Sequence, residues 1–496
     1  MKKLIGFLTV ALLLYCSSLY AANVCIRYGT TYNGDGTTWA SATSAGGVGA
    51  KNVLTTPLTP GNTYYIADGE SSSMVFIGDE YYTGSAYTYI KKATASVHGT
   101  DTGWLSSYGD GQMIFRGLVI EGPFIDIDGI TGELDGSVVP YGFLVQCTAE
   151  TVYVNGDVAA MWITRPHAPY GGEHLYIRHV EIALSPNGCA DLDAANALGW
   201  EPTSAALKGA RGLYTDINIL HCYLKGASTN LHHNWSNSTI SDNYFGENCS
   251  RSFSHGQQIS ALYAHYITLS NNIFVDTETF VIGAHQAEVV PTIASGCSNW
   301  YIYNNIVIGG TLSAVFAMAE SGEYDGVTTW KVYNNTFVNV NCGARGAFFT
   351  GKLTDINSSK SYAYNNLFYN CTTPRMDNAD SISKNTIVHD YNGYLKCTGT
   401  INSADETFPQ RDDVATDPFT DSAGGDYSIL VGTLPVENGI STDLFSTDFI
   451  GITRPQGAAW DIGAYEYVSG ASYPKHQMGA GPTVQNGVGS TVQWFE

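Results

Sequence analysis

Charged residues and helical patterns are both scarce in this sequence. Asp, Glu, Lys and Arg make up only 14% of its 496 residues, and 45 acidic residues outnumber 23 Lys and Arg. The formal charge of −22 excludes binding to nucleic acid or an anionic membrane through the overall electrostatic field. No apolar stripe recurs at 3.6-residue spacing over a dozen residues, which excludes a helical repeat protein.

Long apolar runs are absent beyond the first residues. The apolar run 4–14 follows two lysines and precedes two alanines, the pattern of a bacterial signal peptide over residues 1–22. This run is too short to span a membrane, and no other stretch resembles a transmembrane segment. We therefore expect a secreted protein, extracellular or periplasmic, without a membrane span.

Cysteine spacings typical of metal or redox sites are also absent. Of the ten cysteines, nine follow the predicted signal peptide, an odd number that includes no CxxC pair. Because no zinc-site spacing is present, we expect no cofactor. Cys249, Cys342 and Cys371 follow three copies of a short repeat at similar distances, which favours buried thiols stacked inside the fold.

The most regular feature is a short repeat between residues 175 and 388. Its clearest copies read ITLSNNIF at 267–274, WYIYNNIV at 300–307, WKVYNNTF at 330–337 and SYAYNNLF at 361–368. Weaker copies read TISDNYF at 239–245, SISKNTIV at 381–388, INILHCYL at 217–224 and LYIRHVEI at 175–182. Each copy is a strand of alternating apolar residues followed by a polar corner, and the copies return every 20 to 35 residues or so, roughly the period of a solenoid. The repeat predicts a β-solenoid.

The second Asn of each copy anchors the repeat. A tight bend between strands favours Asn, and stacked Asn side chains can hydrogen-bond from coil to coil. The anchor positions are Val180, Cys222, Asn243, Asn272, Asn305, Asn335, Asn366 and Asn385. We interpret the Asn residues as structural and expect them to form one column at a corner of the solenoid.

These residues also carry a family resemblance. The NNxF units, the signal peptide and DIGAYEY at 461–467 resemble the secreted parallel β-helix proteins of the pectate-lyase-like superfamily. The resemblance implies an all-β fold, a single-stranded right-handed parallel β-helix with an N-terminal cap. It implies no single activity, because that superfamily includes lyases, glycoside hydrolases, epimerases and adhesins.

The predicted organisation has five segments along the chain. They are the signal peptide 1–22, the N-terminal cap and first coils 23–120, the parallel β-helix 121–395, irregular C-terminal coils 396–467 and a flexible tail 468–496. Within the helix, FIDIDGITGELDG at 124–136 contains Asp126, Asp128, Glu133 and Asp135. Calcium is a possible ligand there, but the EF-hand spacing is absent and the alternating Ile residues favour a strand.

Histidine is concentrated in one part of the chain. Nine of the twelve His residues lie between positions 167 and 285, and basic residues outnumber acidic ones between 205 and 256. Histidine exchanges protons near neutral pH, and a locally positive region can accept an acidic ligand. His179 and His221 replace corner Asn residues, so we interpret those two as structural.

Register places the candidate site on three successive coils. The alignment matches Leu231 with Phe253 and Phe280. The predicted catalytic residues are Arg251, His255, His233 and Glu278. The predicted substrate-binding residues are Lys225, His232, Trp235, Gln257 and His285. Arg251 would neutralise a substrate carboxylate, a His would exchange a proton, and Trp235 would stack on a sugar ring.

Two classes of function remain open. The first is a secreted enzyme that cleaves an acidic polysaccharide, by β-elimination or by glycoside hydrolysis. The second is a non-catalytic glycan-binding or adhesive solenoid, which the 33 Tyr residues would suit. The Arg-x-Pro-x-x-Arg signature of pectate lyases and the motif set of polygalacturonases are both absent. In either case we expect a monomer whose partner is a polysaccharide.

Overall fold

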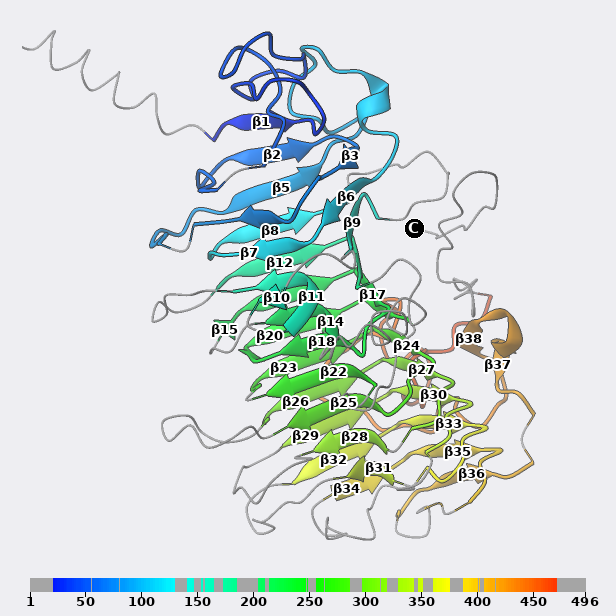
Figure 1. The fold of residues 1–496 in the computed structure, drawn as a ribbon. Helices are drawn as coiled ribbons and strands as arrows, with labels where there is room; N and C mark the ends of the chain where they lie inside the picture. The colour runs from blue at the N-terminus through cyan, green and yellow to red at the C-terminus, as the bar shows by residue number, and fades with distance from the viewer. Residues whose placement is uncertain are drawn as a thin grey trace, which may run out of the picture.

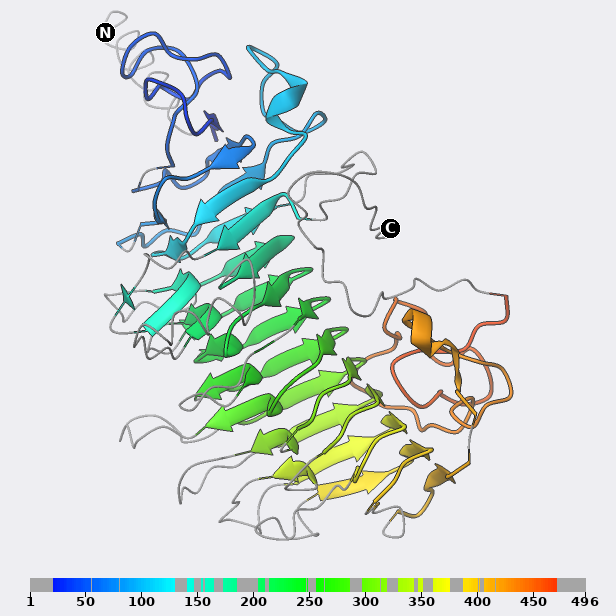
Figure 2. The same cartoon turned by 45° about the vertical axis from the view of Figure 1, so that its right-hand side comes forward.

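Three long β-sheets run along one axis, and their strands together form a single stack of coils (Figures 1 and 2). The computed structural model describes residues 21–54, 56–79, 81–129, 141–146, 153–154, 157–164, 173–184, 204–209, 214–246, 248, 256–262, 264–285, 297–312, 314–318, 329–342, 347–350, 360–374, 387–399, 401, 406–414 and 416–470. Within these ranges, no helix has the length and apolar character needed to cross a membrane.

The strands fall into three parallel sheets and a few short additions. Sheet 1 contains β1 (Asn23–Ile26), β2 (Thr63–Ile66), β5 (Thr88–Lys92), β8 (Ile125–Asp128), β12 (Leu175–Arg178), β16 (Ile217–Leu220), β20 (Ser238–Ser241), β23 (Ile267–Ser270), β26 (Trp300–Tyr303), β29 (Trp330–Tyr333), β32 (Ser361–Tyr364) and β34 (Ile387–Asp390). Sheet 2 contains β3 (Gly69–Glu70), β6 (Met113–Arg116), β9 (Phe143–Gln146), β13 (Val180–Ala183), β17 (Tyr223–Lys225), β21 (Tyr244–Phe245), β24 (Ile273–Val275), β27 (Ile306–Ile308), β30 (Thr336–Val338), β33 (Leu367–Tyr369), β35 (Gly393–Leu395) and β36 (Gln410–Asp412). Sheet 3 contains β4 (Val75–Ile77), β7 (Leu118–Ile120), β11 (Asp157–Ile163), β14 (Ser204–Gly209), β18 (Thr229–His233), β22 (Gln257–Leu262), β25 (Phe280–His285), β28 (Ala314–Met318) and β31 (Ala347–Thr350), with β10 (Tyr153–Val154) antiparallel to β11. The short additions are β15 (Tyr214–Thr215) with β19 (Trp235–Ser236), β37 (Phe419–Asp421) with β38 (Asp426–Ile429), and the 3₁₀ helices η1 (Ser106–Tyr108) and η4 (Ser422–Gly424).

Each coil visits the three sheets in the same order. Strands β25, β26 and β27 follow one another along the chain, and β28, β29 and β30 of the next coil pair with them one by one. All of these pairings are parallel, so each coil contacts only the coils before and after it. The predicted β-solenoid is confirmed, and its architecture is that of a parallel β-helix.

Alternation along the strands of sheet 1 separates the core from the outer face. In β26, Trp300 and Ile302 are buried, whereas Tyr301 and Tyr303 are partly exposed. Pairing in register then stacks equivalent residues, so that Trp300 lies against Trp330 with ring centroids 5.1 Å apart. The core is therefore continued from coil to coil by like residues, with the aromatic faces in contact.

The cysteines of the last coils belong to this core. Cys342, Cys371 and Cys397 are buried free thiols. The Cys371 thiol donates to the carbonyl oxygen of Phe337 at 3.4 Å. The expectation of buried, stacked thiols is confirmed for Cys342 and Cys371, while Cys249 lies outside the described residues.

The second Asn of each repeat forms the predicted column. Asn305 donates from its backbone N–H and from its side-chain Nδ2 to Oδ1 of Asn335, both at 2.9 Å. Asn272 donates to Asn305 in the same way, at 3.0 Å. The complete ladder consists of Asn243, Asn272, Asn305, Asn335, Asn366 and Asn392. The Asn-to-Asn hydrogen bonds all run toward the C-terminal end of the solenoid, and each side-chain amide also donates to a carbonyl oxygen of the preceding coil. All members of the ladder are buried.

The last rung of the ladder corrects the predicted repeat. The anchor expected at Asn385 lies outside the described residues, and Asn366 donates to Asn392 instead. Strand β34 pairs with β32 so that the last copy reads IVHDYNGY over 387–394, not SISKNTIV over 381–388. Tyr391 occupies the first Asn position of this copy, which hides the motif from a search for paired Asn residues.

The first Asn of each pair has a different role. Asn304, Asn334 and Asn365 have φ values of 54°, 52° and 57°, the left-handed conformation that turns the chain from sheet 1 into sheet 2. His179 and His221 occupy the same corner with φ values of 54° and 53°. The interpretation that these two His residues replace corner Asn is therefore correct, because their backbone has the same left-handed conformation.

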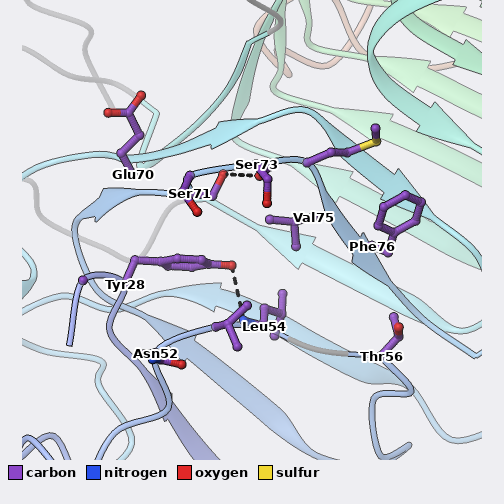
Figure 3. Close-up of a pocket in the computed structure, with 13 residues that line it drawn as sticks. Tyr28, Asn52, Leu54, Thr56, Glu70, Ser71, Ser73, Val75 and Phe76 are labelled. Atoms are coloured by element: carbon purple, nitrogen blue, oxygen red, sulfur yellow. Dashed lines mark hydrogen bonds between the residues drawn. The ribbon is translucent and has the colours of Figure 1, made fainter. Parts of the chain in front are cut away.

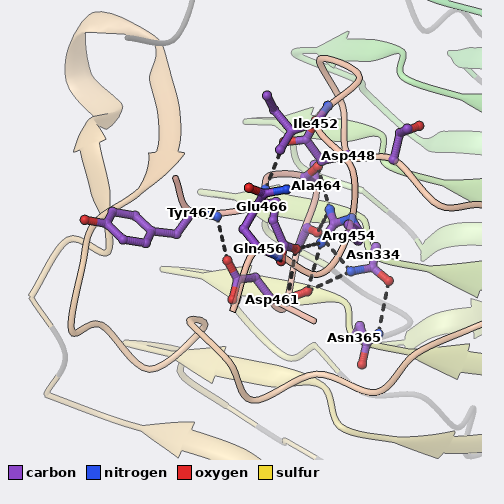
Figure 4. Close-up of polar contacts among 12 residues, drawn as sticks. Asn334, Asn365, Asp448, Ile452, Arg454, Gln456, Asp461, Ala464, Glu466 and Tyr467 are labelled. Carbon is purple, nitrogen blue, oxygen red and sulfur yellow. Dashed lines mark hydrogen bonds and ion pairs between the residues drawn. The ribbon is translucent and has the colours of Figure 1, made fainter. Parts of the chain in front are cut away.

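A C-terminal strap, residues 434–467, is held by the outward side chains of that first Asn column. Asn334 donates to the carbonyl oxygen of Asp461 at 2.8 Å, and Asn365 donates to that of Ile440 at 2.7 Å. At the centre of the strap, the buried Arg454 pairs with Glu466 at 2.9 Å (Figure 4). The motif DIGAYEY thus lies in the strap and binds it to the solenoid.

Candidate functional site

The residues at the centre of the predicted site divide into two groups. Arg251 and His255 lie outside the described residues. His233 and Trp235 are fully buried, with ring centroids 4.9 Å apart, and His233 also stacks on Trp300 at 5.9 Å. The prediction of Trp235 as an exposed sugar platform is therefore wrong. Burial also lowers the pKa of His233 to about 3, which is unsuited to proton exchange near neutral pH.

The register assumed for sheet 3 is also wrong. Leu231 pairs with Ile259, and Ile259 pairs with Ile282 of the next coil. The sequence alignment instead matched Leu231 with Phe253 and Phe280. The corners between sheets differ in length from coil to coil, so a fixed offset from the Asn ladder does not predict which residues of sheet 3 are neighbours.

Three of the other predicted residues belong to sheet 3. His232 is partly exposed on β18, where it pairs with Lys208 of β14 and Ser260 of β22. Gln257, at the start of β22, is buried, and His285 ends β25. The structure brings these residues onto neighbouring strands.

The remaining two predicted residues lie elsewhere. Lys225 ends β17 in sheet 2, and its Nζ lies 2.8 Å from Glu181 Oε1. Glu278 is exposed in the connection before β25, where its backbone N–H donates to Asn248. Lys225 is thus already bound to a carboxylate in its own sheet, and neither residue lies on the strands that carry His232.

A cluster of polar and aromatic side chains from successive coils lies on the outer face of sheet 1. We call it the β12 surface. It consists of Tyr87, Tyr89, Lys91, Phe124, Asp126, Asp128, His174, Tyr176, Arg178, His179, Asp216 and His221. These residues come from four successive coils, and most are partly exposed.

Two His–Asp contacts bracket β12. His174 immediately precedes the strand and His179 immediately follows it, both with positive φ. His179 Nδ1 lies 2.9 Å from Asp128 Oδ1 of the preceding coil. His174 Nδ1 makes a hydrogen bond to Asp216 of the following coil. A carboxylate that accepts from Nδ1 fixes the ring and leaves Nε2 as the nitrogen that exchanges a proton with a ligand.

Arg178 ties the same face together. Its Nη2 lies 2.7 Å from each carboxylate oxygen of Asp126 and 3.5 Å from Asp128 Oδ2. Burial raises the pKa of the Asp126 carboxyl, and the hydrogen bonds from Arg178 oppose this rise. Asp126 and Asp128, the residues considered for calcium, are therefore partners of Arg178 and His179. Across the described ranges, no group of three His, Cys, Asp or Glu side chains is arranged to hold a metal.

His221 extends the cluster by one coil. Its ring stacks on that of His179, with centroids 5.1 Å apart and planes inclined by 8°. Desolvation lowers the pKa of His221, the charges of His179 and Arg178 act in the same direction, and Asp242 opposes them. The neutral form of the His221 ring is therefore favoured beside His179.

Aromatic rings form the other half of the β12 surface. Tyr87 is the centre of this group, 6.0 Å from Tyr176, 6.1 Å from Tyr89 and 5.4 Å from Phe124 between ring centroids. Phe124 in turn stacks on His174 at 4.5 Å. Partly exposed Tyr rings beside polar groups offer both an apolar face and hydrogen-bonding hydroxyls, the combination that suits a sugar ring.

Two sequence motifs belong to this surface, and each was interpreted as a strand of the solenoid without a functional role. FIDIDG at 124–129 places two Asp residues at alternate strand positions, and LYIRHV at 175–180 places Tyr176 and Arg178 there. Pairing of β8 with β12 brings Asp126 beside Tyr176 and Asp128 beside Arg178. Each motif alone fits a structural role. The two motifs form one cluster only because β8 and β12 are paired in neighbouring coils, although 51 positions separate Asp128 from His179 in the chain.

A cavity of about 610 Å³ lies near the N-terminal end of the solenoid (Figure 3). Tyr28 and Leu54 line one side, and Ser71 and Ser73 line the other. Two hydrogen bonds join groups of the lining: the Tyr28 hydroxyl accepts from Leu54 N–H at 3.3 Å, and the Ser71 hydroxyl donates to Ser73 O at 2.9 Å. The β12 surface, with its His, Asp and Arg side chains, is therefore the better candidate for a functional site than this cavity.

Comparison with known proteins gives similar folds only. No protein-family model matches the chain, and no curated protein matches its sequence. Among solved structures, the chain is similar to pectate lyase Pel9A, with 11% identity, 90% of this chain and 97% of that chain covered, and a TM-score of 0.40. The catalytic unit of a GH87 α-1,3-glucanase from Streptomyces thermodiastaticus has 10% identity, coverages of 72% and 66%, and a TM-score of 0.30. The endo-xylogalacturonan hydrolase from Aspergillus tubingensis has 11% identity, coverages of 61% and 83%, and a TM-score of 0.27. At these values no residue role is carried over from those proteins.

Proposed function

We propose that the protein is a secreted, carbohydrate-active enzyme that binds and cleaves a polysaccharide on the β12 surface. The observation that carries the proposal is the pair of His–Asp contacts at the two ends of β12, with Tyr rings between and beside them. Each contact orients an imidazole for proton exchange, and the rings offer stacking faces for sugars. Both features lie on a partly exposed strand face that is rigid because it is part of a long sheet.

The charges of the surface favour hydrolysis of a neutral glycan. Lys91 and Arg178 are its only cations when the His residues are neutral, against the carboxylates of Asp126, Asp128 and Asp216. A net negative surface repels a polyanion, and elimination would require a cation to neutralise a uronate carboxylate. Hydrolysis instead requires an acid that protonates the leaving oxygen and a base that activates water.

In this proposal His179 is the group that exchanges a proton with the substrate, and Asp128 holds its ring. His174, held by Asp216 at the other end of β12, positions the sugar by hydrogen bonding. Arg178 is a positioning residue, because it fixes Asp126 and Asp128 relative to each other. Cleavage of an acidic polysaccharide through Arg251 and His255 stays a separate prediction from the sequence.

Incubation of the purified mature protein with neutral and uronate polysaccharides tests the proposal. Product masses distinguish hydrolysis, which adds water, from elimination, which leaves an unsaturated sugar. We expect His179→Ala to lower turnover about 10²–10⁴-fold, the usual share of general acid–base catalysis. His98→Ala is the matched control, because His98 pairs with Asp101 at 2.8 Å on the N-terminal cap.

Three outcomes would count against the proposed site. Full activity in both His174→Ala and His179→Ala would exclude the β12 surface. Loss of activity in Arg251→Ala or His255→Ala alone would move the reaction to the segment that contains these two residues and favour the acidic polymer. Binding without any cleaved product would identify a non-catalytic glycan-binding solenoid.

A further inference from the structure

A row of side chains continues from the β12 surface along the outer face of sheet 1. Parallel pairing sets one residue of each coil directly beside the next, so equal positions form a line along the solenoid axis. This axial row consists of Tyr89, Asp126, Tyr176, Asn218, Thr239, Thr268, Tyr301, Lys331 and Tyr362. The nine residues belong to β5, β8, β12, β16, β20, β23, β26, β29 and β32, which are neighbours in this order in sheet 1; all but β16 are labelled in Figure 1.

Seven of the nine residues in the row are partly exposed, Asp126 and Asn218 are buried, and the residues on either side of each on its strand face the core. Tyr301, Lys331 and Tyr362 are each partly exposed, and the residues on either side of Tyr362, Ser361 and Ala363, are buried. Among the exposed aliphatic side chains of the described residues, none belongs to a strand of sheet 1. The outer face of the sheet is therefore polar and aromatic, unlike the apolar centre of a protein–protein interface.

Aromatic rings return at the far end of the row. Lys331 Nζ lies 5.7 Å from the centroid of the Tyr301 ring, and the rings of Tyr362 and Tyr364 are 6.4 Å apart. Tyr266, 54% exposed, immediately precedes β23 in the coil before Tyr301. Between the two aromatic groups the row contains only short polar side chains.

We propose that a single glycan chain lies along this row, parallel to the solenoid axis. The distal site, defined as Tyr266, Tyr301, Lys331, Tyr362 and Tyr364, holds the part of the chain remote from β12. The inference rests on the proposed function and is carried by the continuity of the row with the β12 surface. Aromatic faces separated by amide and hydroxyl side chains match a polymer of rings with hydroxyls at their edges.

The spacing of the coils sets the length of the ligand. Tyr176 and Tyr301 are four coils apart, which corresponds to about 19 Å at about 4.8 Å per coil. A disaccharide is too short to contact both ends of the row, whereas an oligosaccharide of several units can do so. Affinity should therefore rise with chain length, and only the long oligosaccharides should depend on the distal site.

Binding of cello-, xylo- and galacturono-oligosaccharides of increasing length, measured by calorimetry, tests the inference. We expect Tyr301→Ala/Tyr362→Ala to weaken binding of the longest bound oligosaccharide about ten-fold, through loss of two aromatic contacts. Binding of the shortest bound oligosaccharide should be unchanged. Tyr32→Ala is the control, because Tyr32 is 45% exposed in the N-terminal cap and belongs to no strand of sheet 1.

The outcomes separate this inference from the proposed function. If the wild type binds no saccharide of the panel and none of the tested polysaccharides, the proposed function fails and the inference fails with it. If the wild type binds but affinity does not grow with length, or the distal double variant binds long oligosaccharides as tightly as the wild type, only the inference is overturned. Equal weakening for short and long oligosaccharides would also overturn it.

Discussion

The side-chain amide of Asn392 donates a hydrogen bond to the carboxylate of Glu406 at 3.0 Å. Its backbone N–H donates to the same carboxylate at 3.3 Å, as the N–H of every earlier rung donates to the next Asn. The Asn ladder therefore ends on a buried negative charge. Tyr394 adds a third hydrogen bond at 2.7 Å, and His389 Nδ1 lies 3.0 Å away. A charged acceptor strengthens these bonds, and a chain of hydrogen bonds polarises in one direction.

Glu406→Leu should loosen the C-terminal coils. The substitution leaves the donors of Asn392 and Tyr394 buried without their acceptor, which costs about 3 kcal/mol. Glu406→Gln keeps one acceptor oxygen and should cost less. Hydrogen exchange at the amides of Asn366 and Asn392 measures the effect locally. Equal protection in Glu406→Leu and the wild type would show that the ladder does not need its terminal acceptor.

Asn305→Leu should destabilise the middle of the solenoid. Asn305 donates to the carbonyl of Leu269 and to Asn335, and it accepts from Asn272. Their loss should lower the free energy of unfolding by about 1–3 kcal/mol. The exposed Asn438 provides a control, because Asn438→Leu should cost well under about 1 kcal/mol. Superimposable urea transitions for Asn305→Leu and the wild type would contradict a stabilising ladder.

The sequence predicted the parts of the fold that repeat locally. Paired Asn residues mark the corner after sheet 1, because that corner has nearly the same backbone in every coil, and Asn305 and Asn335 were placed correctly. Asn392 was missed because Tyr391 takes the left-handed position in that coil. The corners of variable length could not be predicted from the repeat in one sequence. The pairing of Leu231 with Ile259 depends on such a corner and was therefore missed.

The candidate site was less predictable for a related reason. Asp128, Arg178 and His179 form one network, yet His179 follows Asp128 by 51 positions, more than the usual repeat of roughly 20 to 35 residues. Each looks structural in its own motif, and the network exists only after β8 and β12 are paired. Trp235 was misassigned because residues of one alternating strand face opposite sides, and an error of one position moves a side chain from surface to core.

His233 should make the protein less stable in acid. Burial lowers its pKa to about 3 in the folded chain, whereas an unfolded His titrates near 6.5. Below the pKa of the unfolded chain, the unfolded chain therefore binds a proton that the folded chain does not. The free energy of unfolding consequently decreases as the pH is lowered. The loss should reach about 2–3 kcal/mol near pH ~4.5. His233 lies between Trp235 and Trp300, and His233→Phe should reduce the difference between the urea midpoints measured at neutral and acid pH. An unchanged pH dependence would show that another group is responsible.

Arg454→Met should release the C-terminal strap. Arg454 is buried and donates to Glu466 at 2.9 Å and to the carbonyl of Ala464 at 2.8 Å. Without this cation the buried carboxyls of Glu466 and Asp461 lose their main counter-charge, and removing one partner of a buried ion pair costs about 3–5 kcal/mol. Limited proteolysis should then cleave within the strap while the melting of the solenoid changes less.

The pH dependence of that variant distinguishes a lost charge from lost packing. Burial already raises the pKa of the Glu466 and Asp461 carboxyls, and Arg454 opposes this rise. Removing Arg454 should raise both pKa values further, so the folded strap binds protons that the unfolded strap releases. Its stability should therefore be greatest in acid and be lost as pH rises through the folded-state pKa values. Protease resistance of Arg454→Met should recover as the pH falls, and a strap that is equally sensitive at every pH would show that Arg454 acts through packing alone.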